Sequence, residues 1–488
     1  MFDKINKHLI VALVVSFLVL DLLSIISYFY PIGQIIIFGL IIITFVYACF
    51  KNIAWAVAAV IIELILGSQG YWFFVDINGS HLPLRIIFFV ILWSRFITSI
   101  KLGDLTSLVR QSFFKWWSLG LLGIVLGMVM GFRNGFGNWF LDVNGYLFIF
   151  YLIPLWHWRK HWFENFIALV IAALIYLSFK TTALLYLYTH FTAFDLLPVY
   201  NWIRNTGFGE ITYAGGGWFR IFSQSHIFAA TATAALWLWP LVNKSKLYLS
   251  NYSWLASTSV VTAILFASMS RSFWLGTFLA ILCLVVYLWV KSQVNFREIF
   301  YWLTSGLVII LLSLGLLIMV VKFPWPTPLS GDLGALINRT GQGVGEAATE
   351  SRLKLLDPLV VQIKKNWLLG QGFGATVTYL SSDPRIVRSS AGGTGLVTTY
   401  SFEWGYLDMW LKMGLIGIGL YLLFWVQLFK LSINSSLSKS VLVSTIAAAL
   451  TVVFVNITTP YMNHPLGIGS LMLLAIYLFE YNEHAEAN

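Results

Sequence analysis

Long apolar runs with few charges alternate with short polar connections along most of this chain. Fourteen such runs can be distinguished, at residues 9–28, 33–50, 53–69, 84–100, 117–132, 144–157, 165–188, 226–243, 253–269, 273–291, 299–321, 402–430, 441–458 and 466–480. Most approach the roughly 20 residues that a helix needs to cross the hydrocarbon core of a bilayer. The runs are continuous rather than alternating, and backbone in lipid must satisfy its own hydrogen bonds, so they predict helices and not a β-barrel. We therefore expect an all-α, polytopic transmembrane bundle of about 12 to 14 spans.

Two polar connections are long enough to fold, residues 189–225 and 323–401. In the second, residues 347–366 place leucine, valine and isoleucine at helical spacing with basic residues between them, which predicts an amphipathic helix lying flat on the membrane. Residues 381–399 are rich in serine and glycine and predict a loop. The sequence thus indicates a single integral membrane domain over residues 1–488, with both long connections on its outer side.

Composition and charge support this class and orient it. Hydrophobic residues make up 59% of the chain and charged residues only 10%, which excludes a water-soluble globular domain. One side of the proposed spans collects the basic residues Lys4, Lys7, Lys51, Lys101, Arg110, Lys115, Arg159, Lys160, Lys244, Lys246, Lys291, Arg297, Lys430 and Lys439. The positive-inside rule then predicts that both termini are cytoplasmic. The net charge of +10 reflects this bias, and without a basic tract it gives no support to nucleic-acid binding.

Motifs for metals, disulfides and nucleotides are missing from the sequence. Cys49 and Cys283 each fall within a predicted span, so they imply neither a disulfide framework nor a metal site. No HExxH, DxD or CxxC spacing occurs, and no glycine motif of the Walker or dinucleotide-binding type follows a strand. We expect no metal and no cofactor.

The short outer connections hold arginine and no lysine. The residues are Arg85, Arg133, Arg204, Arg220 and Arg271. A guanidinium group is always charged and its fork matches phosphate oxygens, so a lipid-linked diphosphate at the outer leaflet would account for them. The alternative is contact with lipid headgroups, or a loop salt bridge with Asp195 or Glu210.

Several charged residues fall inside the predicted spans, where they are costly and often functional. Lys180 lies toward the outer half of the run 165–188 and can either bind phosphate or extend to the headgroups. Asp21 and Glu63 are expected to form internal ion pairs. Asp142 is expected at the surface.

One composite signature lies between Gly345 and Gly417, with the two parts ESRLKLLDPLVVQIKKNWLLGQGFGA and TTYSFEWGYLDMWLKMGLIG. It resembles the core shared by the O-antigen ligase and polymerase superfamily, in which a serine-arginine start, an xxNPLxGxGxG run and a helix ending in GLxG face the outer side of the membrane. Trp367 stands where that family usually has proline. SMSRSFWLG, around Arg271, is similar to the family's SRxxWLG element. GWFRIFSQSH, around Arg220, resembles its arginine ahead of a further span.

The resemblance places Glu403 at the family's histidine. Tyr406-Leu407 match the YL of the HNxYLxxLxExGLxG pattern, so the histidine falls on Glu403 and the asparagine on Trp404. A carboxylate at the apolar top of a span can have a raised pKa and accept a proton from an acceptor hydroxyl. The alternative is a structural pair between Glu403 and an outer arginine. Further candidate accessory residues are Asp408, His226 and Arg388. His226 is expected to face outward, and Asp408 can instead pair with Lys412, four residues on.

The resemblance implies a GT-C-like enzyme that polymerises polyprenyl-diphosphate-linked oligosaccharide repeat units, as in O-antigen or exopolysaccharide synthesis, at the outer face of the bacterial inner membrane. Arg220, Arg271, Arg352 and Lys180 would hold the diphosphate, and Glu403 would activate the acceptor hydroxyl. Glu403 favours the polymerase branch, because the ligases resemble one another in having histidine there. The implied partners are an undecaprenyl-diphosphate-linked glycan, membrane lipid and a chain-length regulator protein.

Two alternatives remain open from the sequence. One is an O-antigen ligase that transfers glycan to lipid A core. The other is a non-catalytic transporter of lipid-linked sugars or anions, which would show helices broken by proline or glycine at corresponding positions of two halves. The prolines within residues 324–328 interrupt only a loop.

Overall fold

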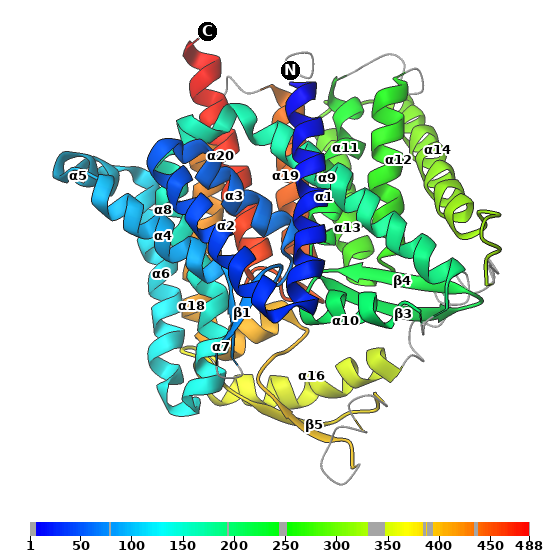
Figure 1. Ribbon diagram of the computed structural model, residues 1–488. Coiled ribbons are helices and arrows are strands. Elements are labelled where there is room, and N and C mark those ends of the chain that lie inside the picture. Colours follow the sequence, from blue (N-terminus) through cyan, green and yellow to red (C-terminus); the bar gives the residue numbers. More distant parts are fainter. Residues whose placement is uncertain are drawn as a thin grey trace.

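The computed structural model describes residues 6–77, 80–192, 195–243, 251–329, 347–383, 387, 394–433 and 438–487. Within these residues, most helices run between the same two ends of the molecule, and three two-stranded antiparallel sheets accompany them (Figure 1). The fold is therefore the all-α, polytopic helical bundle that the apolar runs predict.

The first half of the chain contains α1 (Lys7–Phe29), α2 (Pro31–Lys51), α3 (Ile53–Leu66), β1 (Phe74–Ile77), β2 (Ser80–Pro83), α4 (Leu84–Ser99), α5 (Leu102–Arg110), α6 (Ser112–Gly131), the 3-10 helix η2 (Phe132–Asn134), α7 (Phe136–Tyr146), the 3-10 helix η3 (Leu147–Tyr151), α8 (Leu152–His157), α9 (Arg159–His190), α10 (Leu197–Asn205), β3 (Gly209–Gly215) and β4 (Trp218–Ser223). The second half contains α11 (His226–Asn243), α12 (Tyr252–Ala267), α13 (Arg271–Val290), α14 (Phe296–Val321), α16 (Ala347–Lys365), β5 (Val377–Leu380), β6 (Leu396–Thr399), α18 (Gly405–Ser432), α19 (Lys439–Val455) and α20 (Pro465–Ala487).

Every apolar run predicted to span the membrane falls on helix. Within the described residues, nine helical segments are long and apolar enough to cross a membrane, or ten if the bent pair α4–α5 forms one span. The remaining predicted runs correspond to the shorter apolar helices α3, α12 and α19, and to α11, which contains Pro240. The number of full-length spans is thus lower than predicted, because some helices end inside an apolar run. For example, α3 ends at Leu66, and Gly67 follows as its cap.

Both termini lie at one end of the bundle, at the top of Figure 1, and α16 with its hairpin lies at the other end. This arrangement agrees with the predicted placement of both termini on one side. The two long polar connections do fold: the first contains α10 and the β3–β4 hairpin, and the second contains α16, β5 and β6. We refer to the end that carries them as the loop end.

The predicted amphipathic helix 347–366 is α16, and its apolar face packs mainly on protein. Leu355, Leu359 and Ile363 are buried in a cluster with β5 and the first turns of α18, whereas Leu353 and Val361 are exposed. The buried side chains of α16 therefore cover the loop end of α18.

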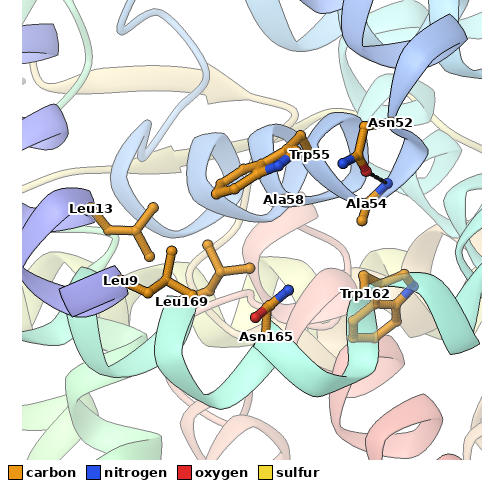
Figure 2. A pocket seen from close by; sticks show the side chains of 9 residues that line it. All are labelled: Leu9, Leu13, Asn52, Ala54, Trp55, Ala58, Trp162, Asn165 and Leu169. Carbon is orange, nitrogen blue, oxygen red and sulfur yellow. Dashed lines mark hydrogen bonds between the residues drawn. The ribbon is translucent and has the colours of Figure 1, made fainter. Parts of the chain in front are cut away.

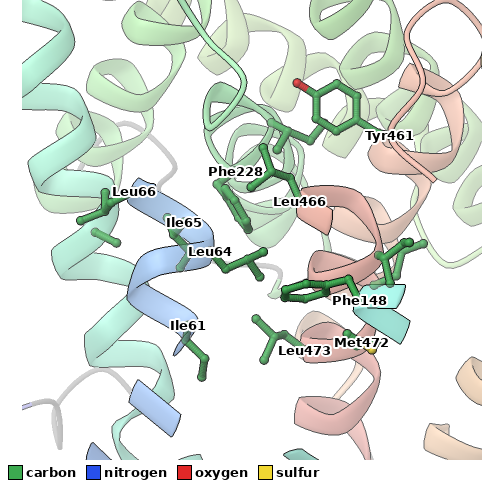
Figure 3. Packing of buried hydrophobic residues seen from close by; sticks show 14 of the residues in the cluster. Ile61, Leu64, Ile65, Leu66, Phe148, Phe228, Tyr461, Leu466, Met472 and Leu473 are labelled. Atoms are coloured by element: carbon green, nitrogen blue, oxygen red, sulfur yellow. The ribbon is translucent and has the colours of Figure 1, made fainter. Parts of the chain in front are cut away.

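The main core lies between the central helices. In Figure 3, side chains of α3 such as Ile61 and Leu64 lie near Phe148 of η3 and near Leu473 of α20. The helix α6 approaches α18 closely, since a Cβ atom on Gly123 would lie 2.5 Å from the carbonyl oxygen of Gly417. This close packing fixes α18, which carries several of the charged residues considered below.

Candidate functional site

The glycine-rich part of the sequence signature forms a tight loop between α6, α7 and α18. Gly370, Gly372 and Gly374 have φ angles of +78°, +87° and +77°, in the left-handed region that favours glycine. A Cβ atom on Gly372 would lie 2.1 Å from the backbone nitrogen of Gly131 in α6. The glycine spacing of this motif therefore serves close backbone packing.

The segment before that loop also supplies hydrogen bonds to a break in α18. Gly414 has φ 66° and ψ 178° within the helix, which interrupts its own hydrogen-bond ladder. The backbone N–H groups of Leu415 and Ile416 instead donate to the carbonyl oxygens of Trp367 and Leu368, at 2.9 and 3.2 Å. The freed amides are thus satisfied inside the protein, and α18 is locked to the signature segment.

A buried charge network lies beside this loop. The Lys412 ammonium of α18 is 2.7 Å from Asp142 Oδ1 of α7 and 2.6 Å from Asp408 Oδ1. Asp142 Oδ2 also accepts from the backbone N–H of Gly374, and Asp408 Oδ2 accepts from the Asn463 amide, both at 2.6 Å. The side chains of Lys412, Asp142 and Asp408 are 3%, 9% and 1% exposed.

The network confirms one prediction and corrects another. Asp408 does pair with Lys412, as its spacing indicates. Asp142 does not lie at the surface, because its carboxylate is enclosed between α7, the glycine loop and α18. Lys412 has no predicted role beyond this pairing, although a lysine inside an apolar run of α18 is the same signal that Lys180 gives in α9.

Lys180 forms a second internal ion pair. Its ammonium is 2.7 Å from Asp21 Oδ2 of α1 and its side chain is 8% exposed. The ring centroids of Phe208 and Trp202 lie 3.7 and 4.7 Å from the same ammonium, and Trp72 donates its indole N–H to Asp21. The predicted internal pair of Asp21 is confirmed. The burial of Lys180 favours a structural role over the predicted contact with headgroups or diphosphate, because protein groups already compensate its charge.

Two more arginines have protein partners. Arg85 is buried with its Nε 2.8 Å from Glu63 Oε2, and it also donates to the Ser68 carbonyl oxygen. This confirms the internal pair expected for Glu63. On the surface, Arg204 Nη1 of α10 lies 3.5 Å from Glu210 Oε1 of β3. This is the loop salt bridge that the sequence offered as an alternative.

The structure brings Arg220 and Arg271 to the same turn at the loop end. Arg220, on β4, donates through Nε to the Ser268 carbonyl oxygen at 2.9 Å, and its guanidinium carbon lies 4.5 Å from the Phe222 ring centroid. Arg271 is the first residue of α13, three residues after Ser268. The Arg220 guanidinium therefore lies at the turn that leads into the N-terminus of α13, where Arg271 begins the helix, a position that suits an anion.

Arg352 and Glu403 form a third group at the loop end. Arg352, on α16, makes an ion pair with Glu403, two residues before α18 begins. The Trp404 indole N–H donates to the Arg352 carbonyl oxygen at 3.1 Å. The side chains of Arg352 and Glu403 are 41% and 49% exposed. Glu403 thus has the arginine partner that the sequence offered as an alternative. The apolar surroundings expected for Glu403 are not found, since it lies outside the helix and its side chain is half-exposed.

Two candidate residues remain, His226 and Arg388. His226 is completely buried at the start of α11, where the Ser223 N–H donates to its Nδ1 at 3.0 Å and its Nε2 lies 2.9 Å from Thr181 Oγ1. His226 thus lies at the loop end of α11, but its side chain does not reach the surface, and both of its ring nitrogens already have partners. Arg388 lies outside the described residues.

Comparison with known proteins does not identify a family. No family model matches the chain, and no curated protein matches it. In the described part of the chain, no group of three or more histidine, cysteine, aspartate or glutamate side chains could hold a metal ion. The fold and its charged groups define a multi-pass helical membrane protein with arginines gathered at the loop end and ion pairs buried inside the bundle.

Proposed function

We propose that this protein polymerises polyprenyl-diphosphate-linked oligosaccharide repeat units by glycosyl transfer at the outer face of a bacterial inner membrane. The observation that carries the proposal is the position of Arg220, Arg271 and Arg352 at the loop end, together with Glu403. The sequence resemblance to O-antigen ligases and polymerases supports the same reading. The bundle supplies the lipid-facing surface that a polyprenyl chain requires, since it exposes long apolar faces.

In the proposed reaction a hydroxyl of one lipid-linked repeat unit attacks the anomeric carbon of a second unit. The bond between that carbon and the phosphate oxygen breaks, and polyprenyl diphosphate leaves. Arg220 and Arg271 stabilise the negative charge that develops on the leaving group. Glu403 takes the proton of the attacking hydroxyl, and Arg352 orients its carboxylate. The donor is already activated, so the transfer uses no other energy source.

Exchanging arginine for lysine tests the diphosphate role at position 271 and the orienting role at position 352. Arg271→Lys and Arg352→Lys are each expected to lose most glycan transfer, because a point charge does not reproduce the bidentate guanidinium fork. The measurement is polymer length and amount in membranes supplied with lipid-linked repeat units. Arg204→Lys, which alters an exposed loop pair, is the control and should keep full activity. Full activity of both test variants would remove the arginines from the mechanism.

The proposed topology has its own test at described residues. In a variant without Cys49 and Cys283, a cysteine at the exposed position Thr398 of β6 should react with a membrane-impermeant maleimide in intact spheroplasts. A cysteine at Asn251, just before α12, should react only after permeabilisation, because it lies at the end that carries the termini. The opposite labelling pattern would place the loop end in the cytoplasm and rule out polymerisation at the outer face.

A further inference from the structure

A small open pocket lies at the end of the bundle that carries the termini, remote from the arginines of the loop end. Its volume is about 70 Å³, and its walls come from α1, α3 and α9. In Figure 2, Trp55 of α3 and Asn165 of α9 lie on facing sides, and Leu9 and Leu13 of α1 close one flank. Nothing in the proposed glycosyl transfer uses this site.

The pocket becomes more apolar with depth. All three helices begin at this end, so Asn52 and Asn165 lie nearer the surface than Ala58 and Leu169, which are six and four residues further along α3 and α9. At 1.5 Å per residue, these steps correspond to about 6 to 9 Å along the helix axis. That distance is comparable to the passage from headgroup to acyl chain in a bilayer leaflet.

Two side chains near the mouth of the pocket, those of Trp55 and Asn165, are exposed. Trp55 is 49% exposed, and an indole with an apolar body and one N–H group suits the membrane interface. Asn165 is exposed, and its amide has no hydrogen-bond partner among the described residues. An amide without a partner is unfavourable beside lipid tails. The Asn165 amide therefore suits a ligand that brings a polar group to the mouth of the pocket.

Basic residues flank the same mouth. Lys7 lies two residues before Leu9, and Lys51 immediately precedes Asn52, and both residues are exposed. Lysines of this kind attract anionic lipid headgroups, by about 1 kcal/mol each near a membrane surface, a factor of about five in affinity. The pocket thus combines a basic rim, hydrogen-bonding groups at its mouth and an apolar floor.

We infer that this pocket binds an anionic glycerophospholipid of the leaflet on the side of the termini. The phosphate lies between Lys7 and Lys51, the glycerol and ester region faces Asn165 and Trp55, and the first methylene groups of one acyl chain enter beside Ala58. A volume of about 70 Å³ is less than half of the roughly 150 Å³ cavity that holds benzene in an engineered protein, so only a short part of the chain is enclosed.

Native mass spectrometry of the full, delipidated chain in a non-ionic detergent tests this inference. Phosphatidylglycerol should bind more tightly than phosphatidylcholine with the same acyl chains. Lys7→Gln and Lys51→Gln should each weaken phosphatidylglycerol binding about five-fold. Lys115→Gln, the same charge change at an exposed residue of α6 away from the pocket, should leave it unchanged. Asn165→Leu should weaken binding of both lipids, and Ala58→Phe should abolish it by filling the floor.

Several outcomes would overturn the inference. Equal binding of the two lipids would show that the basic rim selects nothing. Unchanged binding in Asn165→Leu and in the two lysine variants would place the lipid elsewhere on the bundle. Displacement of phosphatidylglycerol by millimolar inorganic phosphate would show a site for the free anion and not for a lipid. Because Lys7, Lys51 and Asn165 have exposed side chains, their variants should fold, and the test does not depend on the folding of Ala58→Phe.

Discussion

Lys412→Met is expected to destabilise the protein by about 3 to 5 kcal/mol, the usual cost of removing one partner from a buried ion pair. The change leaves the Asp142 and Asp408 carboxylates enclosed near each other with their shared cation removed. Two buried like charges are unfavourable, and the glycine loop that Asp142 holds should loosen with them. The measurement is the thermal unfolding temperature of the purified protein in detergent, with size-exclusion chromatography used to detect the folded fraction.

Two further variants make this prediction specific. Lys354→Met breaks an exposed pair between Lys354 and Glu350 on α16 and should leave thermal stability unchanged, because water screens that pair. Combining Lys412→Met with Asp142→Asn and Asp408→Asn removes the buried charges together and should recover much of the lost stability. If Lys412→Met alone unfolds at the wild-type temperature, the network does not carry charge as the structure indicates.

Glu403→Gln is expected to reduce glycan transfer by about 100- to 10,000-fold, the usual contribution of general-base catalysis. Glutamine has nearly the same shape but cannot take a proton from the attacking hydroxyl. The half-exposed position of Glu403 leaves room for an acceptor glycan to approach, although its pairing with Arg352 is also what a purely structural glutamate would show. Rates of chain elongation by the purified variant, at saturating donor, measure the loss.

A catalytic role and a structural role predict different patterns across variants. If Glu403 is the base, the variant should remain folded, bind donor as the wild type does, and lose the acidic limb of the pH–rate profile. If Glu403 only docks α16, Glu403→Gln and Arg352→Gln should have equal and small effects on thermal stability, because water screens a half-exposed pair, and transfer should stay within a few-fold of wild type. Glu350→Gln, the same change at an exposed glutamate of α16, should keep normal activity.

The fold class and the helix positions follow from the sequence because both rest on local hydrophobicity. Each predicted apolar run lies on helix, and residues 347–366 were assigned within one residue of α16. The number of full-length spans is harder to predict, because helix ends depend on caps such as Gly67, which a hydrophobicity pattern does not reveal. The loop-end hairpin β3–β4 was also not predicted, since its aromatic and glycine residues fit either strands or an interfacial loop.

Ion pairs between residues far apart in the sequence could not be predicted. Periodicity identifies Asp408 and Lys412 as neighbours on one helix, and that pair is present. The pairs Lys180–Asp21 and Lys412–Asp142 join residues 159 and 270 positions apart, so no local pattern reveals them. The same limit explains why Lys180 appeared free to reach a diphosphate and why Asp142 appeared to lie at the surface.

Reconstitution tests the proposed glycosyl transfer at the loop end most directly. Purified protein in proteoliposomes, supplied with defined polyprenyl-diphosphate-linked repeat units and no metal or nucleotide, should yield a ladder of elongated glycans. It should also release one polyprenyl diphosphate for each linkage formed. Transfer to lipid A core in place of elongation would contradict polymerisation and indicate a ligase. Movement of the lipid-linked glycan across the membrane without any new glycosidic bond would contradict the enzyme altogether and indicate a transporter.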